Sequence, residues 1–475
     1  MKINESINFD EIWDINPRLQ TEKSVLFKNN LLNEKQKSQL SIFYSLENNI
    51  NYCKATKFKN LVHFQHSSNI PLQRWFPYRE GYSTELVTTF LQELNIRGNV
   101  FDPFAGSGTT LISARNANLQ SYGIDINPVS VLVARTKNVQ YSAEDIDNII
   151  MEKDKIKTTE NFDTSCICNI DFTINMFNAE ILQILLQYKD YILKIPRIQT
   201  KNLFFVAWLS IIEEVSNIKK EGNGIKYKNR KRTPTGYISI PKDEWEKKQF
   251  PADKFLYIKN KLLKKIEMYL FDIKNSYGII NKPPIIFNED CLLFDELFSD
   301  ELEFTFYSPP YCNCFDYFEI HKVELWLGGF VSDRSMFNMY RQKGFRSNTS
   351  SIRNKPIIYK NGNIESLLSI VEKNKLWSNH IPNIVRGYFD DMHTLLKKLF
   401  LQTQKNGYVG IVIGNSAYNG VIIPSDLLIA QIANEIGFKI ENVFITRHLT
   451  TSSQQKKDLV PLNEYLRESI VLLKK

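Results

Sequence analysis

Long apolar runs are absent from this sequence of 475 residues. No stretch reaches the roughly 18–20 consecutive apolar residues that a membrane-spanning helix needs, so we expect no membrane partner. The first residues, 1–17, are polar and acidic, whereas a secretory signal peptide would be basic and then apolar. A cytoplasmic protein is the expectation that follows.

Cysteine is scarce, and its spacing disfavours a zinc site. The six cysteines include no C-x-x-C pair. The C-x-C pairs at 166–168 and 312–314 would need further ligands, with histidines nearby, to hold zinc. We therefore expect no metal, and free thiols fit a reducing compartment.

Two familiar phosphate-binding motifs are incomplete in the glycine-rich stretch at 99–110 (NVFDPFAGSGTT). A phosphate loop needs Lys after its last glycine, and no Lys follows Gly108. The dinucleotide motif G-x-G-x-x-G takes its first two glycines from Gly106 and Gly108, but its third place is Leu111. A different ligand is indicated, although the backbone can still approach it closely.

This stretch nevertheless has the layout of a binding edge. A predicted strand ends at Asp102, a glycine turn follows, and a helix is predicted at 110–118. The next predicted strand, 121–125, ends at Asp125, near the spacing at which a carboxylate can bind ribose hydroxyls. A third, at 284–291, ends in Asp290 and Cys291. Acids at or just before the ends of three strands favour one shared pocket.

A second stretch, 306–311 (FYSPPY), suits recognition of a planar amine. Residues 303–307 predict a buried strand, which two prolines then end. The turn offers the Ser308 hydroxyl and carbonyl groups as hydrogen-bond acceptors, and Tyr311 offers a flat face. A simple Pro-Pro turn is the alternative interpretation. The glycine-rich stretch upstream favours the interpretation as a site that recognises a planar amine.

Together these stretches resemble the S-adenosylmethionine-dependent amino-methyltransferases that act on DNA. Phe104 to Gly108 resembles their F-x-G-x-G signature, and Ser308 to Tyr311 resembles their catalytic motif in its cytosine-N4 form. The resemblance covers the stretches 70–140, 284–330 and 386–475. It implies a Rossmann-like α/β sheet with helices on both faces, joined by mostly helical insertions.

The resemblance also implies roles for individual residues. Tyr82 and Ser83 would line the methionine end of S-adenosylmethionine, Asp125 would bind the ribose and Asp290 the adenine amine. The residues implied for cofactor binding are Tyr82, Ser83, Asp102, Phe104, Gly106, Ser107, Gly108, Thr109, Asp125, Asp290 and Cys291. Those implied for catalysis are Ser308, Pro309, Pro310 and Tyr311.

The expected reaction is direct methyl transfer to the N4 amine of a cytosine flipped out of duplex DNA. Adenine-N6 methylation on the same scaffold is the nearest alternative, and methylation of RNA or of a protein amide is a further one. Attack at carbon 5 of cytosine would want a Pro-Cys dipeptide, which is absent, so Cys312 is interpreted as packing. A cognate restriction enzyme or defence-system partner would fit such an enzyme.

The resemblance leaves out the N-terminal residues and the two long segments between its three stretches. Residues 219–232 hold seven basic residues, predicted as a flexible DNA-contacting loop: Lys219, Lys220, Lys226, Lys228, Arg230, Lys231 and Arg232. The net charge of +8 agrees with a polyanionic partner. We divide the chain into an N-terminal arm (1–70), a cofactor half (71–140), a helical and basic insertion (141–283), the catalytic strand (284–330), a second basic insertion (331–385) and the C-terminal strands (386–475).

Overall fold

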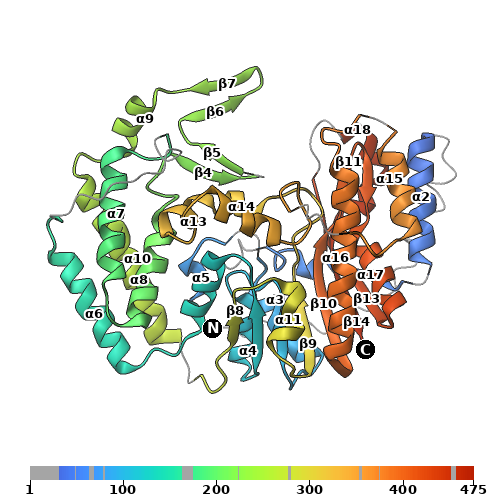
Figure 1. Ribbon diagram of the computed structural model, residues 1–475, viewed down its shortest axis with the longest axis horizontal. Helices are drawn as coiled ribbons and strands as arrows, with labels where there is room; N and C mark the ends of the chain where they lie inside the picture. Colours follow the sequence, from blue (N-terminus) through green and yellow to red (C-terminus); the bar gives the residue numbers. More distant parts are fainter. Residues whose placement is uncertain are drawn as a thin grey trace.

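The structure is a computed structural model that describes residues 32–48, 50–63, 69–78, 81–162, 175–222, 224–276, 280–351, 356–373, 375–450 and 456–475 (Figure 1). At its centre is an eight-stranded sheet with the order β1-β13-β14-β10-β9-β2-β3-β8. Only β14 runs antiparallel to its neighbours. The strands are β1 (Tyr52–Lys54), β2 (Val100–Asp102), β3 (Ser121–Ile124), β8 (Ile285–Phe287), β9 (Leu302–Tyr307), β10 (Thr403–Gly414), β13 (Lys439–His448) and β14 (Arg467–Lys474).

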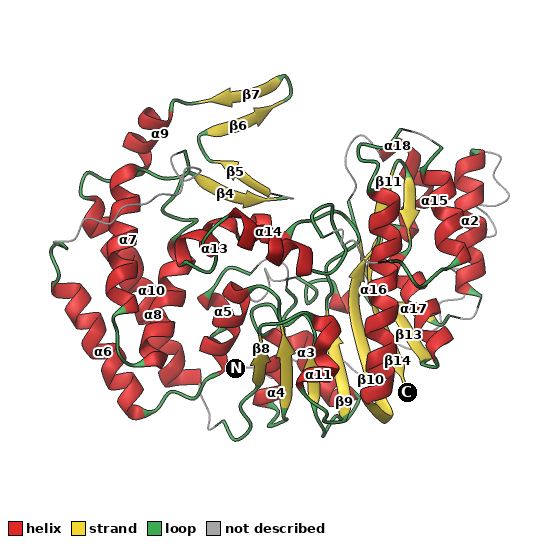
Figure 2. Cartoon of the chain, viewed as in Figure 1, coloured by secondary structure: helices red, strands yellow, loops and turns green. Residues whose placement is uncertain are grey.

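Helices cover both faces of this sheet (Figure 2), which confirms the predicted α/β fold class. Because side chains alternate along a strand, Ile411 and Ile413 of β10 enter one core and Val412 enters the other. The first face carries α16 (Ile381–Gln402) and α17 (Ser425–Ile436), and the second carries α3 (Thr84–Glu93), α4 (Thr109–Asn116) and α5 (Pro128–Asn138).

The two predicted motif strands are neighbours in the middle of the sheet. β2 pairs in parallel with β9, through Val100 opposite Phe304 and Phe101 opposite Thr305. All four of these residues are fully buried. Since parallel strands end at the same edge, the glycine turn after β2 and the Ser-Pro-Pro turn after β9 emerge side by side.

The predicted N-terminal arm takes part in the sheet. Residues 1–31, 49 and 64–68 of this arm lie outside the described residues. The remainder forms α2 (Glu34–Glu47), which Asn33 and Gln36 begin with a capping box, and the edge strand β1, where Tyr52 pairs with Val443 of β13. A strand of three residues carries too little periodicity to be predicted from sequence.

The first insertion forms a helical lobe on the left of Figure 1. The helix Ala179–Leu193 begins where it does because the Asn178 side chain caps it. Residues 163–174, with Cys166 and Cys168, lie outside the described ranges. The lobe contains α6 (Ala143–Thr158), α7 (Ala179–Leu193), α8 (Ile198–Ile211), α9 (Lys242–Gln249) and α10 (Lys254–Ser276).

The basic segment at 219–232 was expected to be a flexible loop, and that prediction is wrong. It folds into two antiparallel hairpins above the helical lobe, in which short neighbouring strands pair with one another (Figure 1). The strands are β4 (Ile218–Glu221), β5 (Gly224–Tyr227), β6 (Arg230–Thr233) and β7 (Gly236–Ser239).

Other boundaries differ from the predictions for local reasons. The strand predicted at 284–291 ends at Phe287. Asp290 lies beyond it and caps the short helix that follows, because its side chain accepts a hydrogen bond from the Leu292 backbone. The helical stretch after the Ser-Pro-Pro turn divides at His321 into α12 (Tyr317–Ile320) and α13 (Lys322–Gly328). The second insertion contains α14 (Arg334–Lys343) and α15 (Gly362–Val371). Within the described ranges, no helix is long and apolar enough to cross a bilayer.

Candidate active site

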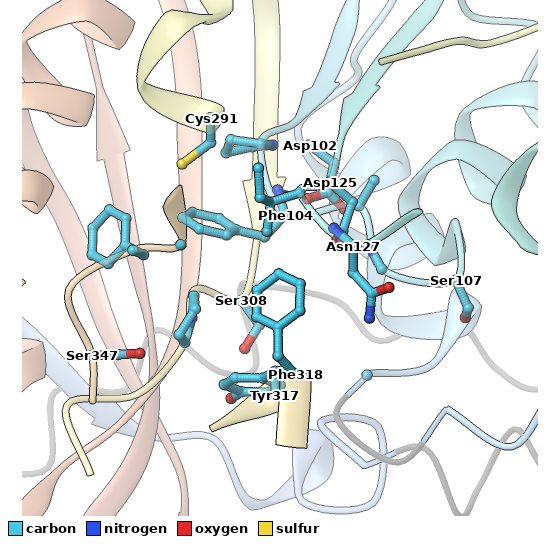
Figure 3. A pocket seen from close by; sticks show the side chains of 18 of the residues that line it. Asp102, Phe104, Ser107, Asp125, Asn127, Cys291, Ser308, Tyr317, Phe318 and Ser347 are labelled. Atoms are coloured by element: carbon cyan, nitrogen blue, oxygen red, sulfur yellow. Dashed lines mark hydrogen bonds between the residues drawn. The ribbon is translucent and has the colours of Figure 1, made fainter. Parts of the chain in front are cut away.

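The glycine turn and the Ser-Pro-Pro turn open into a common pocket of about 1040 Å³ that is open to solvent. Figure 3 shows Ser107, Asp125 and Asn127 on one side of this cofactor pocket, Ser347 on the other and Ser308 between them. Of the residues predicted for cofactor binding, those that line it are Tyr82, Asp102, Phe104, Gly106, Ser107, Thr109, Asp125, Asp290 and Cys291. A concave site lined by aromatic rings and a few carboxyls suits a small organic cofactor.

Both glycines of the turn are needed where they stand. Gly106 and Gly108 have φ angles of +52° and +87°, which side-chain-bearing residues rarely adopt. A Cβ at Gly106 would lie 2.8 Å from the ring of Tyr78, and one at Gly108 would lie 2.9 Å from Nδ2 of Asn138. The turn therefore passes close to its neighbours, and Gly108 serves as the residue that begins α4.

Asp125 fastens the glycine turn to the next helix. Its Oδ2 accepts a hydrogen bond from the Gly106 backbone at 2.8 Å, and its Oδ1 accepts one from the Asn127 backbone, also at 2.8 Å. Burial raises the pKa of this carboxyl to about 6, against the lowering effect of these two bonds. Each oxygen keeps a lone pair, so the carboxylate can still accept from a ligand.

Asp102 is more deeply buried and accepts only from neutral donors within the described chain. These are the Tyr82 hydroxyl at 3.1 Å and the Phe104 backbone at 3.0 Å, with the Thr110 hydroxyl also close. Burial raises the pKa of Asp102 to about 7. Two acids with raised pKa values in one pocket favour a ligand that carries positive charge.

Two residues predicted for cofactor binding lie elsewhere. Ser83 is fully buried and accepts from the Leu86 backbone at 3.2 Å, so its hydroxyl caps α3 and does not line the pocket. Gly108 lies behind the turn, against Asn138 and Ala134. Their sequence neighbours Tyr82 and Thr109 reach the pocket.

The far wall of the cofactor pocket comes from residues that the sequence interpretation missed. Phe345, which follows α14, meets the Phe104 ring edge-on at 5.4 Å. Other lining residues missed from sequence are Tyr78, Asn127, Tyr317, Phe318, Arg341, Ser347 and Asn348. Part of the predicted second insertion thus covers the pocket.

Ser308 also faces a second pocket, of about 640 Å³. Gly81, Tyr82 and Tyr317 also line both pockets. Pro310 lines only the cofactor pocket, and Pro309 is buried and lines neither. The other residues of the second pocket are Val62, His63, Tyr311, Asn313, Phe315, Arg447 and Glu468. Ser308 therefore lies, with these three residues, where the two pockets meet.

Tyr311 is held firmly in the second pocket. Its hydroxyl donates to Oε1 of Glu468 at 2.7 Å, and burial raises the tyrosine pKa well above its ordinary value. The ring passes directly over Gly414, where a Cβ would lie 2.6 Å from a ring carbon. Tyr311 thus presents a fixed aromatic surface to the pocket.

Arg447 completes this cluster from the neighbouring strand. Arg447 and Glu468 are directly opposite in the β13–β14 pairing, and Nε of the arginine donates to Oε2 of the glutamate at 2.5 Å. Burial, followed by the charge of Arg447, lowers the pKa of His63. The second pocket therefore combines aromatic surface with fixed hydrogen-bonding groups.

The seven basic residues predicted to contact DNA divide into two groups. Lys220 is only 5% exposed and pairs with Glu324 at 2.7 Å, and Lys228 donates to the carbonyls of Glu213 and Ser216. Both ammonium groups are bonded within the protein itself, and the contact of these two residues with DNA stays a prediction. The exposed group is Lys219, Lys226, Arg230, Lys231 and Arg232.

Comparison with known proteins finds related sequences along most of the chain. The N6/N4 methylase family model, described as DNA methylase, matches residues 5–135. The type II methyltransferase M.AvaI of Nostoc sp. is 26% identical over 414 residues, which are 82% of this chain and 83% of that protein. The type II methyltransferase M.BsoBI of Geobacillus stearothermophilus is 27% identical over 467 residues, 88% of each chain. The type II methyltransferase M.MjaII of Methanocaldococcus jannaschii is 31% identical over 119 residues, 24% of this chain and 22% of its own.

Proposed function

Because this chain belongs to the N6/N4 DNA amino-methyltransferase family, we propose that it transfers a methyl group from S-adenosylmethionine to the N4 amine of cytosine in duplex DNA. One observation carries the proposal: Ser308 lines both the cofactor pocket and the second pocket. A methyl donor on one side and an amine on the other would meet at this residue. The cytosine-N4 assignment rests on the serine at this place in the motif.

The chemistry of the cofactor pocket fits S-adenosylmethionine. This molecule supplies an electrophilic methyl group on a positively charged sulfur, beside an ammonium group. Asp102 and Asp125 offer carboxyls that have no cationic partner in the described chain, so they can bind the positive end and the ribose hydroxyls respectively. Phe104 would pack against the adenine, and Asp290 would accept from its amine.

The residues of the Ser-Pro-Pro-Tyr turn would activate the amine. The lone pair of an exocyclic amine is delocalised into its ring, which makes it a weak nucleophile. The Ser308 hydroxyl and the Pro309 carbonyl accept hydrogen bonds from the two N–H groups of the amine, which directs its lone pair towards the methyl carbon. Tyr311 stacks on the base. Bound S-adenosylmethionine would supply the methyl group, the electrons of its C–S bond would pass to sulfur as the N–C bond formed, and one amine proton would leave to solvent.

The second pocket is the proposed site of the target base. A base inside a duplex cannot reach Ser308, so the target must leave the helix. We assign the recognition of the surrounding DNA to residues 141–283, where the cations of the hairpins can contact phosphates. The division of the chain given above is part of this proposal, and a cognate restriction enzyme is the partner that fits a relative of type II methyltransferases.

The test is methylation of mixed-sequence duplex DNA with S-adenosylmethionine, followed by mass spectrometry of the nucleosides and mapping of the modified positions. We expect N4-methylcytosine from the wild-type protein. The Ser308→Ala variant should lose at least about 100-fold in rate, because the amine loses an acceptor in the transition state. Ser366→Ala, on the exposed surface of α15, is the matched control and should keep the wild-type rate.

Each other outcome would count against a different part of the proposal. N6-methyladenine would keep the scaffold but overturn the cytosine assignment. Full activity of Ser308→Ala would overturn the role of the serine. Methylation of RNA alone, under conditions in which duplex DNA is unmodified, would overturn the substrate.

A further inference from the structure

Arg447 lines the second pocket but has no role in the reaction proposed above. Its Nε is engaged by Glu468, while its two terminal nitrogens have no hydrogen-bond partner among the described residues. The side chain lines the same pocket as Ser308 and Tyr311. A guanidinium held at one nitrogen, with its other donors open to a pocket, is suited to recognise a ligand there.

We propose that Arg447 recognises the target base as cytosine, by donating hydrogen bonds to its adjacent N3 and O2 acceptors while Ser308 holds the N4 amine. This inference rests on the proposed function and deepens it. It makes Arg447 the residue that determines which base is methylated.

The surrounding contacts give this arginine a fixed direction. Arg447 lies at the end of β13 opposite Glu468 of β14, and the glutamate side chain is only 3% exposed. The same carboxylate accepts from Tyr311 through its other oxygen. One buried carboxylate therefore sets both the aromatic surface on which the base would stack and the donors that would meet its edge.

The chemistry of the two bases separates them at this point. Next to the amine, cytosine carries N3 and then O2, two neighbouring acceptors spaced like the two oxygens of a carboxylate. Adenine carries N1 and then a C–H in the corresponding places. Arginine presents parallel donors that match two such acceptors, whereas with adenine one donor would face a C–H and remain unpaired. An unpaired donor in a closed pocket is costly, so the arrangement favours cytosine.

A simpler role for Arg447 is to neutralise the buried Glu468. The two roles make different demands. A lysine at 447 would keep a positive charge beside Glu468, but it lacks the planar pair of donors. The variant Arg447→Lys therefore separates recognition of the base from charge pairing.

The experiment uses the full-length protein and a synthetic duplex that carries the sequence context mapped in the methylation test. One duplex has cytosine at the target, and the other has 3-deazacytosine, in which C–H replaces N3. Rates of methyl transfer are measured as kcat/KM for wild type, Arg447→Lys and Arg447→Ala. The control is Arg386→Lys, on the exposed Arg386–Glu365 pair of α16.

For the wild-type protein we expect at least about a 10-fold loss of kcat/KM on the analogue, because a matched acceptor is gone. The kcat/KM of both variants on cytosine should fall at least about 10-fold. It should fall little further on the analogue, because the guanidinium that would contact N3 is already absent. Binding of S-adenosylhomocysteine should stay unchanged, and so should the affinity for the duplex at each salt concentration.

The results that would overturn this inference are distinct from those that test the reaction. Formation of N6-methyladenine would overturn both proposals. Formation of N4-methylcytosine, with Arg447→Lys as active as wild type, would leave the reaction intact and remove the role of Arg447. If neither variant folds, the wild-type protein decides alone: equal kcat/KM on cytosine and 3-deazacytosine contradicts the inference.

Discussion

The hydroxyl of Tyr311 donates to Oε1 of Glu468 across 157 positions of sequence, at a distance of 2.7 Å. This bond ties the turn after β9 to the last strand of the sheet. The same glutamate receives Nε of Arg447, so the carboxylate is shared between an aromatic residue and a cation. The geometry of the proposed target pocket therefore depends on a residue that belongs to neither motif.

We expect Glu468→Gln to slow methyl transfer by about 10-fold or more, because an amide cannot accept from Tyr311 and Arg447 as the carboxylate does. Cofactor affinity should be unchanged, since Glu468 lines only the second pocket. Steady-state kinetics and equilibrium binding of S-adenosylhomocysteine provide the two measurements. Glu365→Gln, in an exposed ion pair, is the control, and a wild-type rate for Glu468→Gln would contradict the argument.

Gly414→Ala should destabilise the protein and reduce activity together. The added methyl group would lie 2.6 Å from a ring carbon of Tyr311, which is fixed by its hydroxyl and cannot move aside without losing that bond. Overpacking of this kind costs about 1–3 kcal/mol in the free energy of unfolding. Denaturant unfolding measures it. Gly362→Ala is the matched control, since its Cβ would meet nothing within 4 Å. Equal stability of the two variants would refute the close approach.

The sequence predicted the centre of this molecule well, because the relevant signals are local. Asp102, the two glycines of the turn and Ser308 lie in short stretches whose residue types determine their backbone. The edge at which parallel strands end is a property of the fold class, so these residues could be placed together from the sequence alone.

The residues that were missed are brought in by pairing over long distances. Arg447 lies near the end of β13, and Glu468 lies near the start of β14. Only the antiparallel register of β13 and β14 makes them neighbours, and no local pattern specifies register. Phe345 reaches the cofactor pocket from an insertion, and no local pattern in the sequence predicts that contact. Lys220 shows the converse: composition suggested a surface cation, and a buried partner, Glu324, fixes it inside.

Cofactor binding should depend on pH through Asp102. Its pKa is raised to about 7 by burial, so the carboxyl is largely protonated below that pH. A positively charged ligand favours the ionised form, hence its binding releases a proton and its affinity rises with pH up to about 7 and then levels off. By the same sign, this group contributes stability to the free protein that is full below its ordinary pKa and is lost as pH rises through about 7.

Isothermal titration of S-adenosylmethionine in buffers of different ionisation enthalpy measures the proton release directly. We expect release of a substantial fraction of a proton near pH 6, and a smaller fraction at pH 8.5. Asp102→Asn should weaken binding and abolish the dependence. Asp333→Asn is a control, because that exposed carboxyl caps α14 away from the pocket. The argument fails if proton release near pH 6 is the same in Asp102→Asn as in wild type.

Mutation of a buried basic residue in the hairpins should lower stability, whereas mutation of an exposed one should weaken DNA binding. Lys220→Met leaves Glu324 buried without its partner at 2.7 Å and should lower the free energy of unfolding by about 3–5 kcal/mol. Arg232→Ala, on the exposed strand β6, should change stability by less than about 0.5 kcal/mol. Its effect should appear in DNA binding, where the slope of log affinity against log salt falls by about 1 for each phosphate that the protein no longer neutralises.

Fluorescence anisotropy of a labelled duplex at several salt concentrations, together with denaturant unfolding, separates these effects. Arg97→Ala, an exposed arginine outside the hairpins, serves as the control for removal of one surface charge. If Lys220→Met reduced the salt slope at unchanged stability, Lys220 would contact DNA after all, as its sequence suggested. If Arg232→Ala matched Arg97→Ala, the hairpins would not contact phosphates. Other residues of the helical lobe would then have to contact the duplex.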